Sequence, residues 1–125
     1  MNPAAYTAVD RAEEQRELAF LVNAKAPEVI ARWAAKHAVP LVHFSTDYVF
    51  DGSGDSPRRE DSPTGPMSVY GASKLAGDMA TMASGGPHLI ARTSWVYAAK
   101  GTNFFRTIAR LASERKELRI VADQI

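Results

Sequence analysis

Short apolar runs alternate with longer amphipathic stretches along this chain, a spacing that predicts strands and helices in turn. Residues 41–44 are predicted to form a buried strand after Pro40, and residues 88–91 a second strand. Residues 1–5 are predicted to end a strand, and residues 118–121 to form a last short strand. Strands that alternate with helices predict an α/β fold with parallel pairing and right-handed crossovers.

The first helical pattern begins near Asp10 and continues to about Ala38. Pro27 lies inside it and has no N–H to donate to the Asn23 carbonyl, so we predict a kink or break there. Apolar residues recur at helical spacing and predict the packing face of this helix. They are Leu18, Leu21, Val22, Val29, Ile30, Trp33 and Ala34.

Two more helices are predicted further along the chain. The second runs over residues 68–83, ends at the Gly85-Gly86-Pro87 turn, and has an apolar face of Leu75, Met79 and Met82. The third opens at residues 101–103, with Thr102 or Asn103 as its cap. Its predicted apolar stripe is Phe104, Ile108, Leu111 and Ala112, with Arg106 and Arg110 facing outward.

Residues 51–66 are rich in Gly, Pro, Ser and Asp and are too long for a tight turn. They could form a linker between domains. Since the apolar patterns on both sides belong to one alternating unit, we prefer a surface loop that covers the region beside Thr46. The chain is therefore predicted to be a single domain over residues 1–125.

The composition excludes several classes of protein. The chain has 125 residues, 46% of them apolar and 23% charged, which suits one soluble domain. A formal net charge of +1 argues against a strongly basic nucleic-acid-binding arm. There is no cysteine, and the three histidines lack metal-binding spacing. Because no membrane-length apolar run and no signal peptide occur, we expect a cytoplasmic protein without a membrane partner.

The most specific chemical signal is the pair Tyr70 and Lys74, which share one helix face at i and i+4. A nearby cation favours the phenolate and lowers the pKa of a tyrosine. A tyrosine tuned in this way can pass a proton to a carbonyl oxygen while hydride reaches the carbon. The alternative is an ordinary solvated helix face.

Polar side chains also follow the predicted strands, where open parallel sheets bind ligands. Ser45-Thr46-Asp47-Tyr48 follows the first buried strand, and Thr93-Ser94-Trp95-Val96-Tyr97 follows the second. The small residues of Asn2-Pro3-Ala4-Ala5-Tyr6-Thr7 would allow a ligand close to the backbone. Turn formation explains the first segment equally well, and core packing is the alternative for Trp95.

Taken together, these segments resemble the dTDP-4-dehydrorhamnose reductase family, which belongs to the extended short-chain dehydrogenases/reductases. Four blocks carry the resemblance, in the same order along nearly the whole chain. They are Asn2 to Asp10, Ser45 to Gly52 (Ser-Thr-Asp-Tyr-Val-Phe-Asp-Gly), Val69 to Gly77 (Val-Tyr-Gly-Ala-Ser-Lys-Leu-Ala-Gly) and Arg92 to Tyr97 (Arg-Thr-Ser-Trp-Val-Tyr). The resemblance implies part of a Rossmann-like, doubly wound parallel sheet.

The resemblance also implies an activity and its catalytic residues. The family reduces the 4-keto group of dTDP-4-dehydro-L-rhamnose with NADPH or NADH, which gives dTDP-L-rhamnose. By this resemblance Tyr70 is the proton donor, Lys74 tunes it and holds the nicotinamide ribose, and Thr46 assists at the substrate oxygen.

Other positions correspond to binding residues of the family. Asp47 and Trp95 resemble its contacts to the dTDP-sugar, and Ala5, Tyr6 and Thr7 resemble the turn on the cofactor side. The family's Gly-rich phosphate loop and its later substrate domain have no counterpart in these 125 residues. We therefore expect the isolated chain to bind the cofactor weakly and to be inactive alone.

The same resemblance leaves two alternatives to a reductase, and the strand prediction adds a homodimer. The chain could be a non-catalytic regulatory or binding subunit of this family, or a degenerate fragment. The strand predicted at residues 1–5 would leave an edge exposed, and such an edge favours self-association, for example as a homodimer.

Overall fold

The sheet is built from two parallel strands. The computed structural model describes residues 1–120 of the chain. In it β1 (Leu41–Thr46) pairs with β2 (His88–Thr93), with Leu41 opposite His88 and Thr46 opposite Thr93. Parallel pairing is thereby confirmed, and both strands run two residues further than predicted.

Residues 1–5 contribute less to the sheet than predicted. Asn2 forms a single parallel bridge to His43, with its backbone N–H donating to the Val42 carbonyl at 2.8 Å. This bridge is on the opposite edge of β1 from β2, so β1 lies in the middle. The prediction of a strand over residues 1–5 is therefore wrong in extent, because one residue alone makes ladder contacts there.

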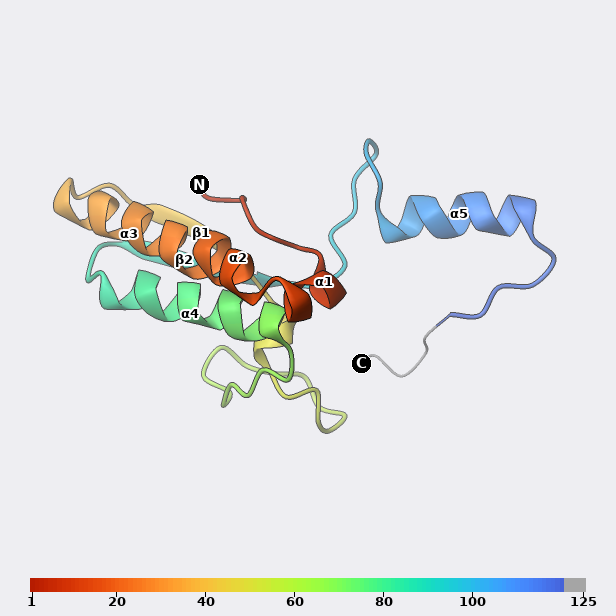
Figure 1. Cartoon of the computed structure of the whole chain (residues 1–125), viewed down its shortest axis with the longest axis horizontal. Helices are drawn as coiled ribbons and strands as arrows, with labels where there is room; N and C mark the ends of the chain where they lie inside the picture. The colour runs from red at the N-terminus through yellow and green to blue at the C-terminus, as the bar shows by residue number, and fades with distance from the viewer. Residues whose placement is uncertain (121–125) are drawn as a thin grey trace.

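Helices cover one face of this sheet (Figure 1). Before β1 come α1 (Val9–Glu14), α2 (Arg16–Phe20), the π-helical turn η1 (Leu21–Lys25) and α3 (Ala26–Lys36). A 3₁₀ turn, η2 (Asp47–Val49), follows β1, and α4 (Val69–Ala83) lies beside α2 and α3 and packs on β1.

The predicted helix over residues 10–38 is thus several segments. Gln15 leaves helical geometry, with φ −115° and ψ 44°, and separates α1 from α2. The π-helical turn η1 stands directly before Pro27, which occupies the first turn of α3. The predicted irregularity at Pro27 is confirmed, and its physical reason is the N–H that proline lacks.

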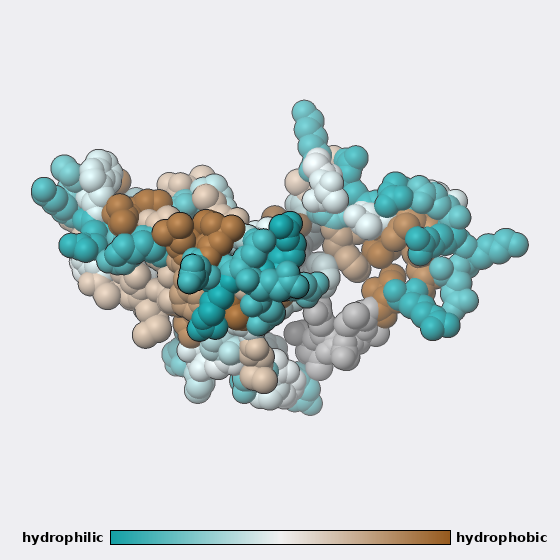
Figure 2. Space-filling view, in the orientation of Figure 1, coloured by the Kyte–Doolittle hydropathy of each residue, from teal (hydrophilic) through white to brown (hydrophobic). Residues whose placement is uncertain are grey.

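The predicted packing face of these helices is confirmed at Ala34 and wrong for most of its large residues. The buried positions are small or polar: Ala12, Ala19, Asn23, Pro27, Ala31 and Ala34. Of the predicted stripe, Leu18, Leu21, Val29, Ile30 and Trp33 are exposed. Figure 2 shows this apolar surface in brown over α2 and α3.

Close helix packing explains why small residues are buried and large apolar residues are exposed. A Cβ added to Gly77 of α4 would lie 2.1 Å from the Asn23 carbonyl oxygen, and one added to Gly86 would lie 2.7 Å from the Ala35 α-carbon. Backbones that approach so closely leave no room for a leucine or a tryptophan between them. Small residues therefore face inward, and the large apolar ones face outward.

On α4, too, small and polar residues are buried while large apolar ones are exposed. The Ser68 side chain caps this helix by accepting from the Gly71 N–H at 3.0 Å. The predicted apolar face is wrong, since Met79 is 59% and Met82 47% exposed. The buried face of α4 is mostly small or polar: Val69, Gly71, Ser73, Lys74, Gly77, Asp78 and Thr81.

The C-terminal part leaves the sheet (Figure 1). In α5 (Phe104–Glu114) the Asn103 side chain accepts from the Arg106 N–H, which confirms that cap, but no residue of α5 is buried. The strand predicted over residues 118–121 is wrong as far as residue 120, where the backbone lies away from any strand edge. Residue 121 is outside the described part.

Residues 51–66 form a surface loop between η2 and α4, and the Gly65 N–H closes its base on the Val49 carbonyl at 3.0 Å. Among the described residues, no helix is long and apolar enough to cross a membrane.

The contact at Gly77 gives a first test. Gly77→Ala is expected to destabilise the fold by about 1–3 kcal/mol, because the added methyl group collides with the Asn23 carbonyl. Helix propensity alone predicts the opposite sign. Urea unfolding measures the change, and Ala80→Gly on the same helix calibrates propensity at about 1 kcal/mol. A Gly77→Ala variant more stable than the parent would refute the close contact.

Candidate functional site

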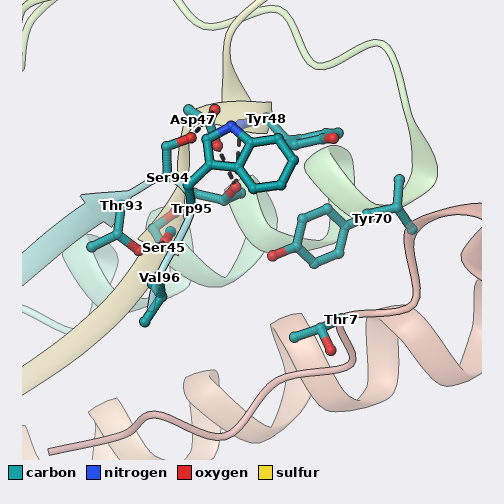
Figure 3. A pocket seen from close by; sticks show the side chains of 11 residues that line it. Thr7, Ser45, Asp47, Tyr48, Tyr70, Thr93, Ser94, Trp95 and Val96 are labelled. Atoms are coloured by element: carbon teal, nitrogen blue, oxygen red, sulfur yellow. Dashed lines mark hydrogen bonds between the residues drawn. The ribbon is translucent and has the colours of Figure 1, made fainter. Parts of the chain in front are cut away.

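A pocket of about 230 Å³ opens at the carboxyl ends of β1 and β2. Figure 3 shows its lining, in which hydroxyl groups and aromatic rings face the same space. The lining residues are Thr7, Val9, Ser45, Thr46, Asp47, Tyr48, Tyr70, Thr93, Ser94, Trp95 and Val96. Five of the eight residues to which the resemblance gave a catalytic or binding role meet here: Thr7, Thr46, Asp47, Tyr70 and Trp95.

Thr46 and Asp47 fix the end of β1. The Thr46 hydroxyl donates to Asp47 Oδ1 at 2.9 Å and accepts from the Tyr48 N–H at 3.3 Å, which caps η2. Asp47 Oδ2 accepts from the Ser94 hydroxyl at 2.8 Å. Since Ser94 directly follows β2, this bond ties the ends of the two strands together.

Tyr70 extends from the first turn of α4 into the pocket (Figure 3). Its ring meets the Tyr48 ring edge-on, with centroids 5.6 Å apart. Burial raises the pKa of Tyr70, and the Thr46 side chain partly opposes this effect. The predicted lowering of this pKa by Lys74 is therefore wrong in direction, so the phenol is protonated at neutral pH.

Lys74 lies one turn further along α4, beneath the pocket, and is not among its lining residues. It is buried, and its Nζ donates to the Phe44 carbonyl of β1 at 2.6 Å. Burial lowers the pKa of Lys74, while the charge of Asp78 raises it. The ammonium thus holds α4 against β1.

The turn at residues 5–7 is held by a side chain that the sequence analysis did not assign to the site. Asn23, which is fully buried, accepts from the Tyr6 N–H at 2.8 Å and donates to the Tyr6 carbonyl at 3.0 Å. Its amide also donates to the Ser73 hydroxyl at 3.0 Å, which in turn donates to the Tyr70 carbonyl at 2.7 Å. The sequence signal for this role was the position of Asn23 in a helical pattern, four residues before Pro27.

This clamp positions Thr7 in the pocket lining, whereas Ala5 and Tyr6 do not line it. The Tyr6 hydroxyl instead donates to Gln15 at 2.8 Å. The predicted cofactor-side turn therefore presents one side chain to the pocket, that of Thr7.

Trp95 is held in an unusual conformation. Its φ is 49°, in the left-handed region that bulky residues seldom adopt. Its ring contacts that of Phe104, with centroids 4.4 Å apart, and 54% of the residue is exposed. Trp95 thus lies at the pocket mouth and links it to the start of α5.

Ionisable groups are buried beneath the pocket. His43 is fully buried, with Nδ1 3.3 Å from the donating Asn2 amide and Nε2 3.6 Å from Asp78 Oδ1. Burial, and secondarily the charge of Lys74, lowers the pKa of His43 to about 4. His43 is therefore neutral at pH 7. Within residues 1–120, no three His, Cys, Asp or Glu side chains are grouped to hold a metal ion.

Comparisons with known proteins agree with this arrangement. The sequence profile of the RmlD substrate binding domain matches residues 1–125. A dTDP-4-dehydrorhamnose reductase of Salmonella typhimurium is 52% identical over 124 residues, which are 99% of this chain and 42% of that protein. The chain thus spans about two fifths of the length of such relatives.

Solved structures give the same result for the fold. A dTDP-4-dehydrorhamnose reductase of Clostridium acetobutylicum aligns with a TM-score of 0.91 and 41% identity, over 96% of this chain and 42% of that one. A reductase of the same name from Bacillus anthracis, in complex with NADP, aligns with a TM-score of 0.88 and 40% identity, over 93% of this chain and 41% of that one. The predicted Rossmann-like α/β class is confirmed.

The buried histidine predicts a pH dependence of stability. Its pKa is about 4 in the folded state against an ordinary 6.5, so the unfolded chain takes up a proton first. His43 should therefore cost up to about 3 kcal/mol of stability as the pH falls from 6.5 to about 4. Urea unfolding at pH 7 and pH 4.5 measures the loss.

Two variants isolate this contribution. His43→Asn should reduce the difference in stability between the two pH values, while His37→Asn, at the exposed end of α3, should leave it as in the parent. Equal losses in the parent and in His43→Asn would mean that other groups cause the effect.

Proposed function

The chain belongs to the family of the RmlD substrate binding domain, and we propose that it forms the catalytic centre of an NADPH- or NADH-dependent reductase. The proposed reaction converts dTDP-4-dehydro-L-rhamnose to dTDP-L-rhamnose. The observation that carries the proposal is the meeting of Tyr70 and Thr46 in one pocket at the carboxyl ends of parallel strands. The names of the relatives, and the NADP in the Bacillus anthracis structure, support it.

The dinucleotide would supply hydride to the carbonyl carbon of the sugar. The donor set fits such a group, because Thr7, Tyr70 and Thr46 present hydroxyls to the pocket. Lys74 would hold the ribose, since its ammonium has three N–H donors and the Phe44 carbonyl accepts from one. The turn at Ala5, Tyr6 and Thr7 would lie along the cofactor.

Tyr70 would act as the general acid. Its raised pKa keeps the proton on the phenol, so the group is ready to donate to the carbonyl oxygen as negative charge develops there. Thr46, at the end of β1, donates its one hydroxyl hydrogen to Asp47 Oδ1 in this structure. With substrate bound it would turn that hydrogen from Asp47 to the carbonyl oxygen of the sugar and orient it. The Asn23–Ser73 chain of hydrogen bonds keeps the first turn of α4, and with it Tyr70, at a fixed distance from Thr7.

Asp47 and Trp95 would contact the nucleotide-sugar. The Asp47 carboxylate suits sugar hydroxyls, and the exposed face of the Trp95 ring suits a flat base or a sugar ring. The pocket is smaller than the range of about 300–1,000 Å³ that is usual for ligand sites. We therefore propose that this pocket binds only the reacting parts of the cofactor and the substrate, the nicotinamide and the sugar carbonyl.

Self-association is part of the proposal as well. The outer edge of residues 1–5 carries backbone groups that could pair with a second copy, as unpaired edges commonly do. No role in binding nucleic acid is proposed, given the net charge of +1.

Replacement of the acid tests the reaction. In the gene product as encoded, Tyr70→Phe should lower kcat by about 10²–10⁴-fold, because general acid catalysis is lost while the ring remains. The assay follows NADPH oxidation with dTDP-4-dehydro-L-rhamnose. Tyr97→Phe is the control, since Tyr97 is 76% exposed and outside the pocket lining. Near-normal turnover by Tyr70→Phe would remove Tyr70 from this role.

A further inference from the structure

We propose that Arg92 is a positioning residue for this centre, because its guanidinium joins the loop at residues 51–66 to the carboxylate of Asp78 behind Lys74. The inference rests on the proposed function. It concerns a residue of β2 that does not line the pocket.

Arg92 makes three contacts in different parts of the chain. Its Nη1 donates to the Glu60 carbonyl of the loop at 3.3 Å. Its Cζ lies 5.3 Å from the centroid of the Phe50 ring, where the loop begins. Its Nε lies 3.6 Å from Asp78 Oδ2 on α4, which makes this contact an ion pair without a hydrogen bond. One side chain therefore contacts the loop, the sheet and the helix that carries Tyr70 and Lys74.

Asp78 needs a cation because its side chain is fully buried. The Ser45 hydroxyl donates to Oδ2 at 2.7 Å, but Oδ1 has no hydrogen-bond partner. Burial raises the pKa of Asp78, and the Ser45 hydrogen bond and the charges of Arg92 and Lys74 lower it. Two cations thus share one carboxylate.

The second of these cations is the proposed ribose ligand. Lys74 and Asp78 are four residues apart on α4, and Lys74 Nζ bonds to the Phe44 carbonyl. If Arg92 is removed, Lys74 becomes the remaining cation near the Asp78 charge, because His43, whose Nε2 lies 3.6 Å from Oδ1, is neutral at pH 7 and Ser45 donates only a hydroxyl. Its ammonium is then drawn from the site, or Asp78 takes up a proton and the field at Lys74 changes. Either event misplaces the proposed catalytic group.

Arg58 provides a matched control. Its Cζ lies 6.0 Å from the same Phe50 ring, and its Nη2 bonds to Asp51 at 2.9 Å. Arg58 is itself a loop residue and holds the loop to Asp51, Ser53 and Phe50, whereas Arg92 ties it to β2 and to Asp78. A difference between the two variants therefore separates order within the loop from the ties of Arg92 to the rest of the fold, and the Asp78 variants then isolate the connection to α4.

The kinetic experiment uses the gene product as encoded, with NADPH and dTDP-4-dehydro-L-rhamnose. Arg92→Met should lower kcat by about 10–100-fold, with KM for the sugar nucleotide changed by less than about threefold. Arg92→Lys should recover part of kcat. Arg58→Met should keep kcat within about twofold of the parent, because Asp78 keeps its partner.

A double variant tests whether Arg92 acts through Asp78. Asp78→Asn removes the charge and keeps the shape, and the pair Arg92→Met/Asp78→Asn should lose no more kcat than the worse single variant. Losses that multiply would overturn the proposal. So would an Arg92→Met variant with parental kcat, or with a raised KM alone.

A second readout does not require activity. Trypsin cleavage after Arg59, whose side chain is 83% exposed, reports how firmly the loop is held. Asp78→Asn should speed this cleavage, although Asp78 does not touch the loop, because Arg92 loses its buried anchor. Equal cleavage of Asp78→Asn and the parent would overturn the link. If the parent lacks reductase activity, the proposed function fails, and the trypsin comparison still decides the link.

Discussion

The rest of the structure depends on the close backbone contact between α4 and the π-helical turn η1. The Gly77 α-carbon lies against the Asn23 carbonyl, where no side chain fits between the two backbones. That approach lets the Asn23 amide reach Ser73 on one side and Tyr6 on the other. The positions of Thr7 and Tyr70 in the pocket therefore depend on this helix contact.

Beneath the pocket, burial of ionisable side chains lowers the free energy of unfolding relative to an apolar core. Lys74, Asp78 and His43 are buried, and hydrogen bonds and ion pairs compensate them incompletely. Buried charge is expensive unless it is paired, so such a layer weakens the fold where it supports the site. A lysine held this way has a fixed place and a lowered pKa.

The sequence predicted the kinds of element well and their faces poorly. Strand and helix positions follow from local periodicity, which is why β1, β2 and α4 were placed within two residues. Which side of a helix is buried depends on how near its neighbour comes, and that distance is not local information. Thr46, Asp47 and Ser94 were predicted from their place after strands, and Tyr70 from its spacing to Lys74 on one helix face. Asn23 and Arg92 act across long sequence separations, so their contacts could not be predicted from neighbouring residues.

The inward faces of α2, α3 and α4 have a consequence for how this sequence tolerates change. A core of leucines is weakened when a side chain shrinks, but Ala31 and Ala34 have almost nothing to lose. Growth by one methylene is the harmful step there, while Leu18 and Trp33 can vary in size at the surface. The inner positions of these helices therefore set an upper limit on side-chain volume, and hydrophobicity is a poor guide to which substitutions they tolerate.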